Sequence, residues 1–429
     1  MTRPIADALD ALRSLGSPEQ MRGVAPGMAS TAPPPLNSHI HLPPNFSAFQ
    51  SVDQAVLLAA EQGLVALGAS NYYDYQVYAD FAHGARQANI FPLYGIEIIC
   101  MDEELRAAGT KINDPGNPGK IYFCGKGITR FDQMTDQAAQ LLESIRLNDS
   151  ARMEQMLLRM SEVFTERGLA TDIGSRDVVD MIVQRHGCDP GTVWLQERHL
   201  SQAFQESLFR QVPPESRLQQ LAQVLGSASS AKDPEDSVAV QNDIRSSLMK
   251  AGRPAFVDET FIDFEDARRL ILELGGIPCY PVVADGASPI SDVEQTAQRL
   301  IAELQQRNLH AAEWIPERNS IQVLSDYVPA MRKAGLVLTA GTEHNTLDLI
   351  PMQPRAKDGE LPEDLRAIFW EGACVVAGHQ FLCLHGECGF VDDQGRLNPA
   401  FDSAEQRIEA LAKLGAAVID RYRQCGPSS

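Results

Sequence analysis

The chain has 429 residues, 44% of them hydrophobic and 22% charged, a composition ordinary for a folded globular protein. Its formal net charge of −20 argues against general binding to nucleic acid backbones, which relies on clustered lysine and arginine. No run approaches the ~18 consecutive apolar residues of a membrane span. The acidic N-terminus lacks the apolar core of a secretory signal. We therefore expect a cytoplasmic protein that binds neither nucleic acid nor a membrane.

Eight cysteines are scattered from Cys100 to Cys425, without the dense pattern of a small secreted scaffold, so reduced thiols are expected. One segment is richer in zinc-ligand types, with His379, Cys383, His385 and Cys388 close together. Their spacing matches no standard zinc knuckle. This segment is therefore expected to be a buried strand and turn with ordinary thiols.

The first part of the chain predicts alternating strands and helices. Residues 1–35 are typical of a short amphipathic helix and a linker rich in Pro, Ala and Gly. From residue 36 to residue 130, short apolar strands alternate with capped helices, as in parallel βαβ units. The strands are expected at residues 36–42, 64–70, 91–100 and 119–128, with helices at 51–63 and 74–89.

The strand pattern stops over residues 131–254, where helical periodicity predicts an all-helical insertion, with helices at 135–147, 150–168, 175–187 and 198–212. Its charged faces are expected to be solvated, and nothing in its sequence assigns it chemistry. The alternation resumes over residues 255–390, and residues 391–429 form a C-terminal helical tail. About seven βα units favour an α/β fold that closes into a barrel over an open sheet.

Functional groups are expected at the carboxyl ends of the strands, where parallel βα folds place their ligands. His39 and His41 are one residue apart on a strand and can aim both rings at one point. Glu97 and Glu343 follow other strands, and imidazole together with carboxylate suits zinc, manganese or iron.

The order of these motifs resembles the polymerase and histidinol phosphatase (PHP) superfamily, in a bacterial branch with a helical insertion. The resembling motifs are HIH at His39, GIE at Glu97, the strand KIYFCGKG, the strand CYP and the late strand end GTEHN, within residues 36–390. The resemblance implies a distorted (β/α)7 TIM-like barrel with up to three metal ions. It also implies hydrolysis of phosphate esters by a water molecule that the metal activates.

The chain departs from the family pattern at several ligand positions. Asn37 replaces an Asp, Asn71 and Tyr72 replace Asp-His, and Tyr122, Tyr280 and the Glu343-His344-Asn345 run replace further ligands. A neutral tyrosine is a poor ligand at neutral pH, because its ordinary pKa is near ~10. Two of the three metal positions should therefore be empty. The remaining position predicts one divalent ion (Zn, Mn or Fe) held by His39, His41, Glu97 and Glu343, with room for water.

The replaced positions are expected to serve the substrate. Tyr72, Tyr122, Tyr280 and Asn345 are candidate catalytic residues that donate hydrogen bonds to a substrate oxyanion. Lys126 and Arg318 are candidates to neutralise a phosphate or carboxylate, and either is equally consistent with a surface charge. His344 stands one residue from the family's ligand position, so its ring is expected to point away from the metal or to act as an outer acid or base.

These residues favour a metal-dependent hydrolase of a small anionic substrate, in particular a phosphate ester. A second hypothesis is a catalytically retired barrel that binds a ligand or partner, with the insertion as a docking surface. A third is an amidohydrolase-like or lyase activity, since a single ion on a barrel also supports that chemistry.

Overall fold

A sheet that closes on itself forms the centre of the molecule in the computed structural model, which describes residues 3–24 and 32–426. Seven strands lie in the order β1-β2-β3-β4-β6-β7-β8, and a short β5 pairs with β3. Between the two ends of this order, the His41 amide donates to the Glu343 carbonyl at 2.8 Å, and the Thr342 amide donates to the His39 carbonyl at 3.1 Å. The expected distorted TIM-like barrel with a helical insertion is therefore confirmed. The strands are β1 (Leu36–Ile40), β2 (Ala66–Ala69), β3 (Phe91–Met101), β4 (Lys120–Lys126), β5 (Ile262–Asp263), β6 (Ile277–Val282), β7 (Ala311–Trp314) and β8 (Val337–Ala340).

The expectation that these strands are all parallel is wrong for β4, which is antiparallel to both β3 and β6. A parallel crossover needs a connection of a dozen or more residues with a packed helix. The segment between β3 and β4 contains only the short α5 (Glu103–Ala108), which buries none of its residues. The chain therefore turns back beside β3.

Amphipathic helices cover the outside of the barrel in the places that the periodicity predicts. Their N-termini carry side-chain caps where the sequence supplies Ser, Asp or Thr, as at Ser51, Asp263, Thr296 and Ser320. Their buried positions are mostly apolar, for example Leu270 and Ile271, and join the barrel core. These helices are α3 (Val52–Glu61), α4 (Val77–Gln87), α11 (Phe264–Glu273), α12 (Ala297–Gln306) and α13 (Ile321–Lys333).

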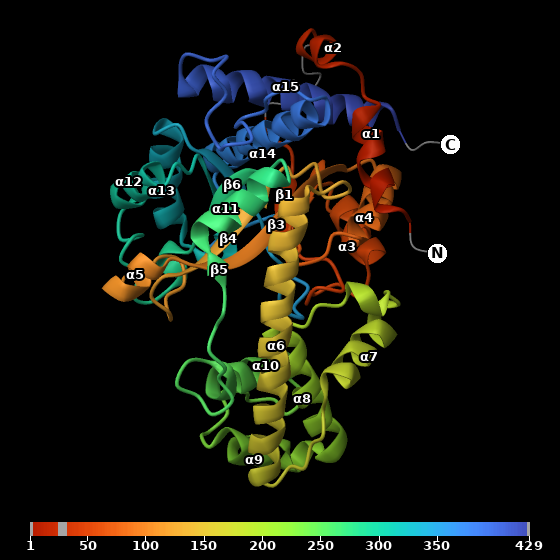
Figure 1. The fold of residues 1–429 in the computed structure, drawn as a ribbon, viewed down its shortest axis with the longest axis vertical. Helices are drawn as coiled ribbons and strands as arrows, with labels where there is room; N and C mark the ends of the chain where they lie inside the picture. The colour runs from red at the N-terminus through yellow and green to blue at the C-terminus, as the bar shows by residue number, and fades with distance from the viewer. Residues whose placement is uncertain (1–2, 25–31, 427–429) are drawn as a thin grey trace.

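The helical insertion forms a second body with its own hydrophobic core. That core gathers apolar residues between Met153 and Val257, separate from the barrel core. The two helices expected at 135–147 and 150–168 are one continuous helix of 31 residues, α6, which runs from the barrel into the insertion (Figure 1). The helices are α6 (Asp136–Glu166), α7 (Ser175–His186), α8 (Glu197–Gln211), α9 (Pro214–Leu225) and α10 (Ser237–Ile244), followed by the π-helical turn η3 (Arg245–Met249).

Two long antiparallel helices, α14 (Glu363–Leu384) and α15 (Ala404–Gln424), lie on the side of the barrel opposite the insertion (Figure 1). The strand expected around His379 is instead the last part of α14. Close packing explains its small residues: a Cβ at Gly372 would lie 1.8 Å from the Leu338 carbonyl oxygen of β8. By length and composition α14 could cross a membrane, but 67% of its most apolar window is buried inside the fold, as in a core helix.

The N-terminal segment packs against the same side of the barrel. The expected helix divides into the 3₁₀ turn η1 (Ile5–Leu9) and α1 (Asp10–Arg13), and the Ala8 carbonyl accepts a hydrogen bond from Tyr94. The predicted linker contains one further short helix, α2 (Pro18–Arg22), closed by a capping box at Ser17. Residues 25–31 of that linker lie outside the described residues.

Candidate metal centre

Two imidazoles and a carboxylate meet at the carboxyl end of β1. His39 Nε2 lies 3.3 Å from Glu97 Oε2, and His41 Nε2 lies 3.2 Å from the same oxygen. The three atoms are buried, and none has a hydrogen-bond partner among the described residues. Buried polar atoms are nearly always paired, so three unpaired atoms within 4.8 Å of one another indicate a missing ligand. Two nitrogens and one oxygen are a donor set that fits zinc, manganese or iron.

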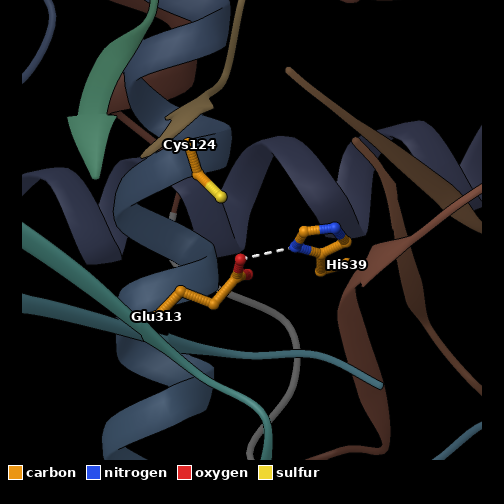
Figure 2. A group of neighbouring side chains, drawn as sticks. All are labelled: His39, Cys124 and Glu313. Atoms are coloured by element: carbon orange, nitrogen blue, oxygen red, sulfur yellow. Dashed lines mark hydrogen bonds and ion pairs between the residues drawn. The ribbon is translucent and has the colours of Figure 1, made fainter. Parts of the chain in front are cut away.

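A second carboxylate orients the His39 ring from behind. Glu313, on β7, lies 2.6 Å from His39 Nδ1, and Figure 2 shows the two side chains pointing at one another. Because a carboxylate accepts a hydrogen, Nδ1 carries the proton and Nε2 faces Glu97. Metal-binding histidines characteristically use their other nitrogen in this way, which fixes the ring and makes it more basic.

Lys126 balances the charge of Glu313 inside the barrel. Its Nζ lies 2.5 Å from Glu313 Oε1, and the two side chains are 3% and 0% exposed. Burial opposes the charge on each group, yet their attraction raises the pKa of Lys126 and lowers that of Glu313. Lys126 is thus committed to the barrel interior and does not line the pocket around His39.

The pKa values of the central groups follow from the same charges. Burial alone would lower the pKa of His39, but the charge of Glu313 and hydrogen bonding raise it to about 9. Burial alone would raise the pKa of Glu97, but His39 and His41 lower it well below its ordinary value. The surrounding carboxylates therefore favour positive charge at this point, and a divalent cation would supply it.

Cys124, on β4, completes a second group that could hold a cation, with His39 and Glu313. Its thiol is directed toward these two side chains in Figure 2 and is fully buried. Burial, followed by the charges of Glu313 and Glu97, raises the pKa of Cys124 well above its ordinary value. The thiol is therefore kept protonated, and the His39–His41–Glu97 group is the better cation site.

Tyr72 contacts this group from the loop after β2. Its hydroxyl donates to Glu97 Oε1 at 2.7 Å, and its ring stacks on His41 with a centroid separation of 5.1 Å. Burial, followed by the Glu97 charge, raises the pKa of Tyr72 well above its ordinary value. The hydroxyl is therefore a hydrogen-bond donor that positions Glu97, leaving Oε2 to face the imidazoles.

Glu343 lies in the same pocket but pairs with a cation. It makes a two-pronged ion pair with Arg318, with Nη1 to Oε1 at 2.9 Å, and it accepts a hydrogen bond from Asn345. It is not one of the groups whose ligand atoms lie within 4.8 Å of one another around Glu97. Glu343 and His344 are both in the left-handed backbone region, with φ of 58° and 51°. In this turn the His344 ring bonds to Thr342 and the Ile350 carbonyl, away from the metal group.

The three candidate tyrosines fall in different surroundings. Tyr72 and Tyr122 both line the pocket, whereas Tyr280 does not. The Tyr280 hydroxyl donates to Glu294 at 2.8 Å, in the layer between β6 and its covering helices. Alternation along β6 explains this position, because the neighbouring Pro281 faces the pocket and Tyr280 therefore faces the other way.

The pocket extends from the metal group to the insertion. It has a cavity volume of about 320 Å³ and is lined by His39, Glu97, Glu343 and Arg318 from the barrel. Arg198, in the first turn of α8, and Arg245, which begins η3, line it from the insertion. The insertion was expected to present solvated charged faces, and its folding places these two of its charged side chains at the barrel mouth.

Three residues of this site were missed by the sequence reasoning. Glu313 left a usable signal, a single acid inside the short apolar strand AAEWIP. Such an acid is costly to bury unless it is paired. Arg198 and Arg245 left none, since arginines at helix starts are ordinary on a solvated surface.

The structure thus defines this protein as a TIM-like barrel that carries a buried group of two histidines and one glutamate at its strand ends. It has the fold of a solved structure from Bifidobacterium adolescentis that carries a provisional description as a metal-dependent phosphoesterase. The identity is 12% and the TM-score 0.51, over 78% of this chain and 96% of the other. An amidohydrolase from Chromobacterium violaceum, solved with sulfate and without metal, is 17% identical at a TM-score of 0.48, over the same shares. No family model and no curated protein matches the chain.

Proposed function

We propose that this protein is a PHP-like, metal-dependent hydrolase of a small phosphate ester. The observation that carries the proposal is the convergence of three buried, unpaired ligand atoms from His39, His41 and Glu97. The provisional phosphoesterase description of the Bifidobacterium structure supports the choice of substrate class. Three protein ligands with an open position are the usual composition of a catalytic metal site.

His39, His41 and Glu97 would hold one divalent ion, with Glu343 as the candidate fourth ligand. When bound, such an ion polarises a substrate oxygen and lowers the pKa of water. Glu313 and Lys126 position the His39 ring, and Tyr72 positions Glu97 through the hydrogen bond to Oε1.

The remaining pocket residues would bind the substrate. The Tyr122 hydroxyl makes no hydrogen bond within the described chain and can donate one to an anionic oxygen. Asn345 and Arg318 meet at Glu343, so an anion that displaces this carboxylate gains both donors. Lys126 is left out of this role because its charge is used by Glu313.

Metal analysis of the purified protein tests the proposal. The wild type is expected to retain about one equivalent of Zn, Mn or Fe, and the His39→Ala/His41→Ala variant to lose it. His83→Ala, at an exposed histidine of α4, is the matched control and should keep the ion. Glu343→Gln tests the fourth ligand, since only a residue that binds the ion should weaken its retention. A screen of phosphomonoesters with added Mn then tests the reaction, and failure of wild type to bind any ion would refute the proposal.

A catalytically retired barrel is the second candidate. It is favoured by two pairs of pocket residues that already bind one another, Tyr72 with Glu97 and Arg318 with Glu343. In that case the protein would be free of metal, and added ions would leave its thermal stability unchanged. An amidohydrolase-like activity would instead appear as metal binding without turnover of phosphomonoesters.

The setting of this activity is proposed to be the cytoplasm. All eight cysteines are free thiols, as suits a reducing compartment.

A further inference from the structure

The insertion closes over a cavity that continues beyond the metal group. A second hollow, under α6 and α8, shares Tyr72, Tyr122, Asn345 and both insertion arginines with the pocket around His39. Aromatic side chains, including Phe46 and Phe261, line this outer part. A ligand held at His39 and Glu97 therefore has room to extend toward α8.

Most cations near this cavity are already neutralised. Lys126 pairs with Glu313, and Arg318 pairs with Glu343. Arg152 and Lys250 both pair with Glu197 at 2.6 Å. These four charges add little attraction for an incoming anion.

Arg198 is different, because its guanidinium makes no ion pair or hydrogen bond with any residue that the structure describes. Its guanidinium lies 5.9 Å from the centre of the Phe46 ring, which holds it at the cavity wall. Arg245 is only weakly satisfied, at 3.6 Å from a Glu197 that has two nearer partners, and its buried Nε has none among the described residues.

The charge of Arg245 acts unfavourably on Arg198. Burial, followed by the neighbouring charge of Arg245, lowers the pKa of Arg198 to about 10. An anion placed between the two guanidinium groups would remove that repulsion. The nearby acids compensate this pair only in part, because Glu197 is shared with two closer cations and the charge of Glu343, which raises the pKa of Arg198, is outweighed by burial and by Arg245.

We propose that Arg198 and Arg245 form the subsite that binds a phosphoryl group of the substrate, making the helical insertion a specificity element of the active site. The paired, planar donors of a guanidinium match the oxygens of a phosphate, and two arginines favour a multiply charged anion over a carboxylate. This inference rests on the proposed hydrolase function and names the residues that would select its substrate.

Titration calorimetry of the metal-stripped full chain with inorganic phosphate tests the subsite. Without the ion, phosphate binding reports on the side chains of the pocket, and the two arginine variants separate the contribution of Arg198 and Arg245 from that of Arg318 and Asn345. Arg198→Gln should weaken binding about tenfold or more, as expected for loss of one charge-assisted contact, and Arg245→Gln should also weaken it. Arg198→Lys should restore part of the affinity. Acetate should bind more weakly than phosphate.

The matched control is Arg210→Gln, at an exposed arginine near the other end of the same helix, which should bind phosphate like the wild type. Absence of phosphate binding by the wild type would overturn the inference, as would equal binding by the Arg198→Gln and Arg210→Gln variants. A folded far-ultraviolet spectrum of each variant excludes loss of structure as the cause.

The outcome is separable from that of the proposed function. Metal retention by His39 and His41, with unchanged phosphate binding in Arg198→Gln, would leave the hydrolase standing and refute the subsite. Phosphate binding that depends on Arg198, in a chain that binds no metal, would support the subsite in a retired barrel.

Discussion

The two ends of the pocket treat charge in opposite ways. At the barrel floor, His39, Glu313 and Lys126 form a buried chain in which each charge touches its opposite. At the insertion end, the Arg198 guanidinium lies 5.9 Å from the centre of the Phe46 ring and within the field of Arg245, and although the Glu343 charge acts on it, no carboxylate of the described chain forms an ion pair with it. A compensated group stabilises the fold and holds its neighbours in place, whereas an uncompensated group is a position where a ligand can supply the missing charge. The paired charges at the barrel floor therefore hold the His39 side chain in position, and the insertion end is suited to binding an anionic ligand.

Removal of the countercharge at the floor should have the largest effect. Lys126→Met leaves Glu313 buried with His39 as its remaining charged partner. Breaking one partner out of a buried pair costs about 3–5 kcal/mol, and the free energy of unfolding in urea should fall by that order. The double variant Lys126→Met/Glu313→Gln should recover part of the loss, while Lys232→Met, at an exposed lysine of the insertion, should change little. A Lys126→Met protein as stable as the wild type would show that the floor is not held by charge.

Comparison with a second buried histidine, His379, shows how the Glu313 carboxylate changes the pKa of His39. His379 accepts from the Phe390 amide at 2.9 Å and lies 3.0 Å from the Gly275 carbonyl, and no acid among the described residues is bonded to it. Burial lowers the pKa of His379 to about 4, the opposite of His39. The unfolded chain then binds the proton more tightly, so stability is present above pH ~6.5 and is lost as the pH falls toward 4.

This difference predicts a steeper pH dependence for the wild type than for His379→Gln. Between pH 7 and pH 5 the unfolding free energy of the wild type should fall by about 2 kcal/mol more than that of the variant. Urea unfolding at the two pH values measures this difference. Parallel pH profiles would mean that protonated His379 is accommodated in the fold.

The candidate metal ligands in the barrel could be predicted from sequence, because the rules that place them apply within single strands. Period-two alternation places His39 and His41 on one face of β1, and the strand-end rule adds Glu97. Neither rule indicates whether a candidate side chain is already paired with another residue of the protein. Lys126 and Arg318 were both expected at the substrate, yet Glu313 and Glu343 pair with them across the barrel. Lys126 and Glu313 lie on strands that are distant in sequence, and Arg318 and Glu343 lie in turns after the neighbouring strands β7 and β8, so only the folded barrel reveals these pairs.

The insertion end could not be predicted in the same way. The helices of residues 131–254 follow from their periodicity, but the return of α8 to the pocket mouth depends on how they pack around their own core. Tyr280 shows the limit within a strand, since a shift of one residue in register decides whether a side chain faces the pocket or the outer helices.

Tyr72 and Tyr280 had the same expected role in the sequence analysis, and their variants test whether Tyr72 positions the Glu97 carboxylate. Tyr72→Phe removes the hydrogen bond to Glu97 and should weaken binding of Zn or Mn by about 10–100-fold, the usual effect of losing a partner of a ligand. Tyr280→Phe removes a bond to Glu294 and should leave metal affinity unchanged. Competition with a chelator measures both affinities. Equal losses in the two variants would place the effect in the fold and not in the orientation of Glu97.

The smallest expected effect concerns Arg198 and is the most direct test of the comparison. Arg198→Met removes a charge that has no described ion-pair partner, so the unfolding free energy should change by no more than about 0.5 kcal/mol. Arg152→Met is the matched variant, since Arg152 is also an insertion arginine beside the cavity but pairs with Glu197 at 2.6 Å and is 5% exposed. It should be destabilised by several kcal/mol, because Glu197 loses one of its nearest cations. A stability loss at Arg198 comparable to that at Arg152 would mean that Arg198 serves the fold. Unchanged stability together with lost phosphate binding would assign its positive charge to the ligand.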